Sequence, residues 1–132
     1  MHVQIPTSND VRAVIFTRSS TIEQQKFNHE LQKNTCLTYL AEQHGISSVT
    51  VLHYCEEANP GTHPDRPGIN WLRQLVVQDA VDVILTDEST RVFRGIGCFQ
   101  EFADLASQYG VRIVCLNDGI DTAQANWMQR LA

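Results

Sequence analysis

Four short, almost uninterrupted apolar runs, separated by segments with helical periodicity, constrain this chain more than any other feature. The runs span residues 11–16, 48–54, 81–86 and 111–116. Between them, apolar side chains recur at helical spacing over residues 27–44, 69–79 and 98–109. Strands that are apolar throughout and alternate with helices are typical of a parallel sheet covered on both faces. The pattern predicts an α/β fold: a single domain with a mainly parallel sheet of four to five strands and helices on both faces.

Length and composition fit one such domain. The chain has 132 residues, of which 42% are hydrophobic, and single domains commonly have about 100–150. Residues 1–10 are interpreted as a leader and residues 11–132 as the domain, in which a last helix begins near 123 and is cut off at 132. No apolar run approaches the ~20 residues that span a bilayer, and no basic segment precedes an apolar one at the N-terminus. We therefore expect a cytoplasmic protein without a membrane partner.

The cysteines and histidines predict neither a disulfide nor a metal site. The four cysteines form no C-x-x-C pair, and the five histidines show no H-x-x-x-H spacing. Each cysteine lies in or beside an apolar stretch, which favours buried free thiols in a reducing compartment. The cysteines are Cys36, Cys55, Cys98 and Cys115. No metal and no other cofactor is expected.

Arginines concentrate in the polar segments that follow the apolar runs. These segments span residues 17–26, 55–68, 87–95 and 117–122, and they contain Arg18, Arg66, Arg91 and Arg94. In open parallel sheets, ligands bind beyond the carboxyl ends of the strands. The net charge of −5 argues against a nonspecific nucleic-acid binder. Arginines that converge on a serine hydroxyl nevertheless suit phosphoryl chemistry without a metal, because fixed cations balance the charge that develops on phosphorus.

Motifs follow each apolar run in a characteristic order. F-T-R-S-S-T-x-E-Q ends the first run, E-E-A-N-P-G-T-x-x-D-R-P-G-I follows the second, T-R-V-F-R the third and D-G-I-D-T the fourth. Each motif alone is compatible with an ordinary loop, turn or helix cap. Together, over residues 11–132, they resemble the catalytic domain of serine site-specific recombinases, the resolvase/invertase family, and most of all the large serine integrases and transposases.

The resemblance implies both a mechanism and partners. Ser20 would attack a DNA phosphodiester and form a 5′-phosphoserine intermediate, which strand exchange and religation would follow. Four arginines would hold the scissile phosphate and a glutamine would support the loop of the nucleophile: Arg18, Arg66, Arg91, Arg94 and Gln24. The expected partners are double-stranded DNA recombination sites and, in the full-length protein, further copies that form dimers and tetramers. No metal or nucleotide is implied, because the phosphoserine bond conserves the energy for religation.

The chain departs from the family pattern at three positions. Glu56 stands where the family usually has aspartate, and its longer side chain can still pair with an arginine. Thr90 occupies the place of the acid in the D-R-x-x-R motif, so a carboxylate is missing there and Thr90 is only a candidate for support. Ser19 replaces a small apolar residue, which leaves two adjacent serines. Their spacing to the motif's arginine and glutamine favours Ser20 as the nucleophile.

Other classes of protein share parts of this pattern. A catalytically inactive recombinase-like domain is the main alternative. A receiver-like regulatory domain would need paired acids at the end of the first strand, where Thr17 and Arg18 stand instead. A cysteine phosphatase would need a C-x5-R loop, and neither Cys55 nor Cys98 has an arginine six positions further on.

Overall fold

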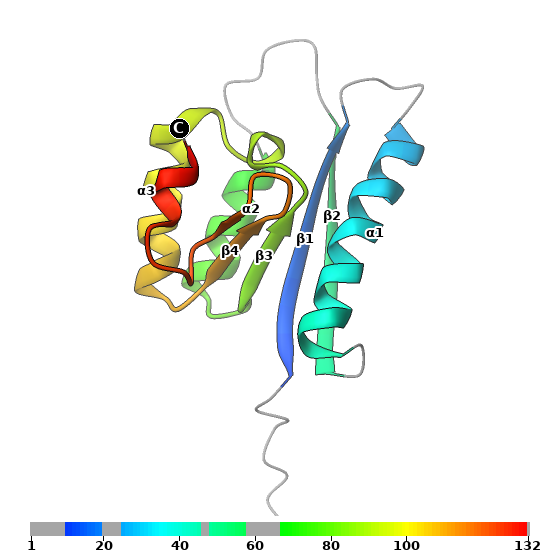
Figure 1. Ribbon diagram of the computed structural model, residues 1–132, viewed down its shortest axis with the longest axis horizontal. Coiled ribbons are helices and arrows are strands. Elements are labelled where there is room, and N and C mark those ends of the chain that lie inside the picture. The colour runs from blue at the N-terminus through cyan, green and yellow to red at the C-terminus, as the bar shows by residue number, and fades with distance from the viewer. Residues whose placement is uncertain (1–9, 20–24, 46–47, 58–66, 132) are drawn as a thin grey trace, which may run out of the picture.

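Five strands form one sheet in the computed structural model, which describes residues 10–19, 25–45, 48–57 and 67–131 (Figure 1). The strands are β1 (Val11–Ser19), β2 (Val49–Glu57), β3 (Val83–Thr86), β4 (Arg112–Cys115) and β5 (Ile120–Asp121). Their order across the sheet is β2-β1-β3-β4-β5, with parallel pairing except between β4 and β5. This arrangement confirms the predicted α/β fold with a mainly parallel sheet.

Helices cover both faces of the sheet, as predicted. On one face lies α1 (Gln25–His44); on the other lie α2 (Pro67–Val77) and α3 (Gly95–Gln108) (Figure 1). Two short 3-10 helices, η2 (Ser89–Arg91) and η3 (Trp127–Leu131), follow β3 and β5. No helix in the described part of the chain is long and apolar enough to cross a membrane.

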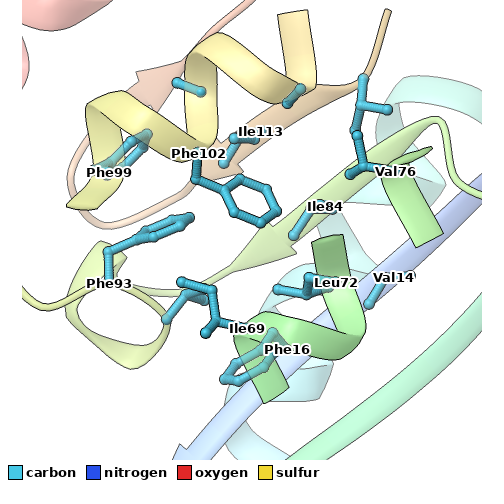
Figure 2. Close-up of a cluster of buried hydrophobic side chains, with 14 of the residues drawn as sticks. Val14, Phe16, Ile69, Leu72, Val76, Ile84, Phe93, Phe99, Phe102 and Ile113 are labelled. Atoms are coloured by element: carbon cyan, nitrogen blue, oxygen red, sulfur yellow. The ribbon is translucent and has the colours of Figure 1, made fainter. Parts of the chain in front are cut away.

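Side chains of the strands alternate between two hydrophobic cores. Val14 and Phe16 of β1 enter the larger core, where α2 and α3 pack on the sheet (Figure 2). Ala13 and Ile15 enter the smaller core beneath α1. Because both faces of β1 are buried, the strand is apolar at consecutive positions, which is the pattern that predicted a parallel sheet.

The first two strands extend further than the apolar runs that predicted them. Residues 17–19 and 55–57, predicted to lie in loops, continue the parallel register of β1 and β2 as far as the pair Ser19 and Glu57. Apart from the helix predicted from residue 123, the other predicted helices and strands agree with the structure to within three residues at each end. The extension is possible because polar side chains at these strand ends find partners on neighbouring elements, as described below.

The C-terminal segment differs from its prediction. In place of an α-helix from 123, the described residues form turns and then η3. Asn126 adopts a left-handed backbone conformation with φ of 67°, which is incompatible with a continuous α-helix. The ring of Trp127 stacks on Phe99 of α3, with centroids 5.4 Å apart. Residues 1–9 of the predicted leader, and Ala132, lie outside the described residues.

The cysteines are free thiols, as predicted, but only two of them are buried. Cys36 and Cys115 lie in the interior, whereas Cys98 is half-buried and Cys55 is exposed. Burial raises the pKa of Cys36 to about 12, so this thiol stays protonated at neutral pH. Cys55 lies on β2, which is an edge strand of the sheet.

Candidate active site

Among the predicted site residues, those that the structure describes lie at the carboxyl ends of β1 and β2 and in the segment between β3 and α3. Those that the structure describes are Arg18, Glu56, Thr90, Arg91 and Arg94. The predicted nucleophile Ser20, together with Gln24 and Arg66, lies outside the described residues. The described geometry is therefore that of the end of β1 and of the groups around it.

Glu56 joins the end of β1 to the start of α2. Its carboxylate lies 3.6 Å from Nε of Arg18 and accepts a hydrogen bond of 3.2 Å from the backbone N–H of Gly68. Glu56 is only 8% exposed, and a buried carboxylate needs such partners because it has lost its hydration. The positive end of the α2 dipole adds to this stabilisation. The longer side chain of glutamate thus reaches an arginine from β2.

Gly68 is the glycine of the D-R-P-G motif, and packing requires it. A Cβ atom at this position would overlap the carboxylate of Glu56 and lie 2.7 Å from the ring of Phe16. That ring is fully buried and stacks on Tyr54 at 5.2 Å between centroids. Consequently α2 can begin directly against β1 and β2 only if residue 68 lacks a side chain.

The carboxylate of Asp87 holds Arg91. The sequence pattern identified no acid for this role, because Thr90 stands where the D-R-x-x-R motif has one. Asp87 accepts hydrogen bonds from Nε and Nη2 of Arg91 at 3.0 and 3.3 Å. Burial opposes the charge on Arg91, but the hydrogen bonds to Asp87 and the negative charges of Asp87 and Glu88 together outweigh it and raise the pKa of the guanidinium. Thr90, in contrast, is exposed. Asp87 could have been found from its position four residues before Arg91, a spacing at which side chains in a helical turn meet.

Arg91 also reaches across to β1, because its Nη1 donates a hydrogen bond of 3.3 Å to the carbonyl oxygen of Arg18. The turn that carries Arg91 is fixed by Asp118, in the turn between β4 and β5, which accepts a hydrogen bond of 2.6 Å from the backbone N–H of Ser89. Ser89 is the first residue of η2, so Asp118 satisfies a donor at the start of that turn. The D-G-I-D-T segment therefore helps to position one of the arginines.

Gln32 of α1 clamps the end of β1 from the other face of the sheet. Its side chain accepts a hydrogen bond of 2.9 Å from the backbone N–H of Arg18 and donates one of 2.8 Å to the carbonyl oxygen of the same residue. Such a contact to backbone atoms leaves no signal in the sequence, which is why the sequence pattern did not identify Gln32.

Ser19 and Arg18 point to opposite faces of the sheet. Thr17 contacts His29 of α1, and alternation along the strand places Ser19 on that same α1 face, where it is 1% exposed. Arg18 instead pairs with Glu56 on the α2 face. The side chain of Ser19 is therefore directed away from the arginine side of the strand.

Arg94 occupies the residue before α3 and is exposed. Within the described residues, no hydrogen bond joins the guanidinium of Arg94 to Arg18 or Arg91. The structure thus brings two predicted arginines together at the end of β1 and leaves the third on the segment that follows η2. The His29, His53 and Cys55 group, which could hold a metal in the described part of the chain, includes none of the predicted site residues.

Comparison with known families agrees with this geometry. A family model described as "Resolvase, N terminal domain" matches residues 13–131. The chain belongs to this family. No curated protein sequence matches the chain. Membership of the resolvase family decides against the receiver-like and phosphatase alternatives.

Solved structures of recombinase domains share the fold. The N-terminal catalytic domain of TP901-1 integrase is 21% identical, with a TM-score of 0.70 over 91% of this chain and 88% of that chain. A resolvase family site-specific recombinase from Streptococcus pneumoniae is 20% identical, with a TM-score of 0.68 over 90% and 80%. The C-terminal catalytic domain of ISC1926 TnpA, an IS607-like serine recombinase, is 28% identical, with a TM-score of 0.62 over 80% and 70%. By family and by fold, this chain is the catalytic domain of a site-specific DNA recombinase.

Proposed function

We propose that this domain cleaves and rejoins DNA through a covalent phosphoserine, with Ser20 as its nucleophile. The observation that carries the proposal is the convergence of Arg18 and Arg91 at the end of β1. Arg91 donates a hydrogen bond to the carbonyl oxygen of Arg18, and each guanidinium pairs with a buried carboxylate. Ser20 directly follows the last residue of β1. A nucleophile at this position would lie close to Arg18 and Arg91, whose guanidinium groups are held by carboxylates.

The chemistry is a transesterification. The Ser20 hydroxyl oxygen attacks phosphorus and loses its proton, the bond from phosphorus to the 3′ oxygen breaks, and that oxygen leaves as a hydroxyl group. Religation reverses the step when a 3′ hydroxyl attacks the phosphoserine. Guanidinium groups bind phosphate oxygens in a bidentate manner and stabilise the charge that grows in the transition state. Arg18, Arg91, Arg66 and Arg94 would supply these cations, and Gln24 would support the serine segment.

The carboxylates orient the cations rather than react. Glu56 and Asp87 are both less than a tenth exposed, and each holds one arginine by its side chain. A guanidinium that is already oriented loses little conformational freedom when phosphate binds. We assign Asp87 the orienting role that the D-R-x-x-R pattern gives to an acid, and no role to Thr90.

Ser19 is the other serine that could attack, and its burial argues against it. The side chain is 1% exposed on the α1 face, opposite Arg18, so DNA could not approach it without removing α1. The partners that we propose are double-stranded recombination sites and, in the full-length protein, further copies in a dimer or tetramer. Residues 11–132 would form the catalytic domain, acting in the cytoplasm, where free thiols persist.

The test is covalent capture on DNA. Full-length protein carrying this domain would be incubated with a labelled library of nicked duplexes, denatured, and separated by electrophoresis. The wild type and Ser19→Ala should retain labelled DNA, whereas Ser20→Ala should bind duplexes in a mobility-shift assay yet retain none covalently. Linkage that persists in Ser20→Ala would refute the assignment of the nucleophile. Absence of linkage in every variant, the wild type included, would identify an inactive domain.

A further inference from the structure

Three side chains of the kinds that bind transition metals gather on the α1 face of the sheet. His29 comes from α1, and His53 and Cys55 come from β2. One ligand atom from each lies within 4.8 Å of the others. His29 is buried, His53 is half-buried and Cys55 is exposed, so the group extends from the interior to the surface and an ion could enter from the cysteine side.

The hydroxyl of Thr17 lies between the two histidine rings of this group. That oxygen lies 2.5 Å from Nδ1 of His29 and 2.8 Å from Nε2 of His53. Sγ of Cys55 lies 3.4 Å from the same Nε2 atom. The two imidazoles meet edge to face, at 65° between their planes. Both histidine nitrogens therefore lie within hydrogen-bond distance of the Thr17 hydroxyl, and the cysteine sulfur lies beside one of them.

Strand geometry explains how the sequence brings these residues together. His53 and Cys55 are two positions apart on β2, so their side chains project from the same face. The parallel register places Cys55 beside Thr17 of β1. His29 of α1 contacts Thr17 on this same face of the sheet. A ligand set made from alternating strand positions and a helix shows neither C-x-x-C nor H-x-x-x-H spacing, which is why the sequence predicted no metal site.

We propose that His29, His53 and Cys55 bind one Zn²⁺ ion, with a water oxygen as the fourth ligand. Zinc prefers cysteine sulfur and histidine nitrogen in a tetrahedron, with bonds of about 2.0–2.1 Å to nitrogen and about 2.3 Å to sulfur. Such bonds separate neighbouring ligand atoms by about 3.5 Å, close to the 3.4 Å between Cys55 and His53. The ligand set contains no carboxylate, so it does not suit Mg²⁺ or Ca²⁺. On binding, the Cys55 thiol releases its proton to solvent.

The ion would join α1 to β2 without contacting the phosphate side of the site. Arg18 and Glu56 face α2, whereas the zinc ligands face α1. The ion would hold α1 against β2, and α1 also carries Gln32, whose side chain clamps the backbone of Arg18. Zinc would thus fix the helix that positions the end of β1. This proposal does not depend on the phosphoserine chemistry.

Metal titration tests the proposal directly. Protein stripped with a chelator and kept reduced would be titrated with Zn²⁺ against a chromophoric chelator, and with Co²⁺ as a spectroscopic substitute. We expect one ion per chain, together with the thiolate-to-cobalt charge-transfer band and the visible bands of tetrahedral Co²⁺. Cys55→Ser and His53→Gln should each weaken Zn²⁺ binding by at least ~100-fold, since loss of mere outer-sphere partners already costs about 10–100-fold.

Two matched variants keep the test specific. Cys98→Ser removes another accessible thiol, and His44→Gln removes another histidine of α1; neither should change the affinity. Zn²⁺ should also raise the melting temperature of the wild type and of both controls, but not that of Cys55→Ser, whose exposed position tolerates the change. The proposal is wrong if the wild type binds no ion at one equivalent, or if Cys55→Ser binds Zn²⁺ as tightly as Cys98→Ser.

Discussion

Replacing Gly68 with alanine should destabilise the domain, although the same replacement usually stabilises a helix. Alanine gains about 0.5–1 kcal/mol over glycine inside a helix. At Gly68, however, the added Cβ would overlap the Glu56 carboxylate and lie 2.7 Å from the Phe16 ring. Overpacking of this kind costs about 1–3 kcal/mol. The sign of the result depends on whether the neighbours can move.

Neither neighbour can move without a loss. Phe16 is 0% exposed and packed between Tyr54 and the larger core. Glu56 would have to give up its hydrogen bond to the Gly68 backbone or its pairing with Arg18. The steric cost therefore outweighs the gain in helix propensity, and we expect the free energy of unfolding to fall by about 1–2 kcal/mol.

Gly97→Ala provides the matched control. Gly97 lies in the first turn of α3, and nothing lies within 4 Å of the position that its Cβ would take. This variant should gain up to about 1 kcal/mol, so the free energies of unfolding of the two alanine variants should differ by about 1–3 kcal/mol in urea denaturation. Equal stability of the two would refute the close packing of α2 against Phe16 and Glu56.

The strands of the core were predictable because a strand that is buried on both faces of the sheet is apolar at consecutive positions. Runs such as 11–16 are apolar at consecutive positions, since β1 supplies side chains to both cores. The polar ends of β1 and β2 carried no such signal. They belong to strands because Thr17 meets His29 and His53, and because Arg18 meets Glu56. These partners lie on other elements, so residues 17–19 resemble a loop when only the sequence is considered.

The site was predictable where a motif fixes residue identity, and unpredictable where a contact involves the backbone or a distant element. The family pattern named Arg18, Glu56 and Arg91, which lie near one another at the end of β1. It did not locate Asp87, which stands outside the D-R-x-x-R motif yet binds Arg91 at 3.0 Å. Nor did it locate Gln32, because the backbone atoms that Gln32 binds are the same in every residue. A chain can thus lose a motif's acid at one position and supply a carboxylate from a neighbouring turn.

Two further tests concern the Asp87→Asn variant and the loss of folding stability at acid pH. Asp87→Asn removes the carboxylate that Arg91 binds at 3.0 Å and leaves it the more distant one of Glu88 at 3.9 Å. This variant should lower the free energy of unfolding by about 1–3 kcal/mol and slow covalent DNA capture. Thr90→Ala should change the free energy of unfolding by less than about 0.5 kcal/mol. Equal effects in urea denaturation would contradict the assignment to Asp87. At the far edge of the sheet, Arg112 donates hydrogen bonds of 2.8 and 2.5 Å to Asp121 and lowers the pKa of that carboxyl. A depressed folded pKa gives stability that is fully present above the unfolded value of about 3.9 and is lost as the pH falls through the folded value. The wild type should therefore lose stability below about pH 4 more steeply than Asp121→Asn. If the free energies of unfolding of the two proteins, measured by urea denaturation, fall in parallel as the pH is lowered, this ion pair does not contribute to the loss of stability at acid pH.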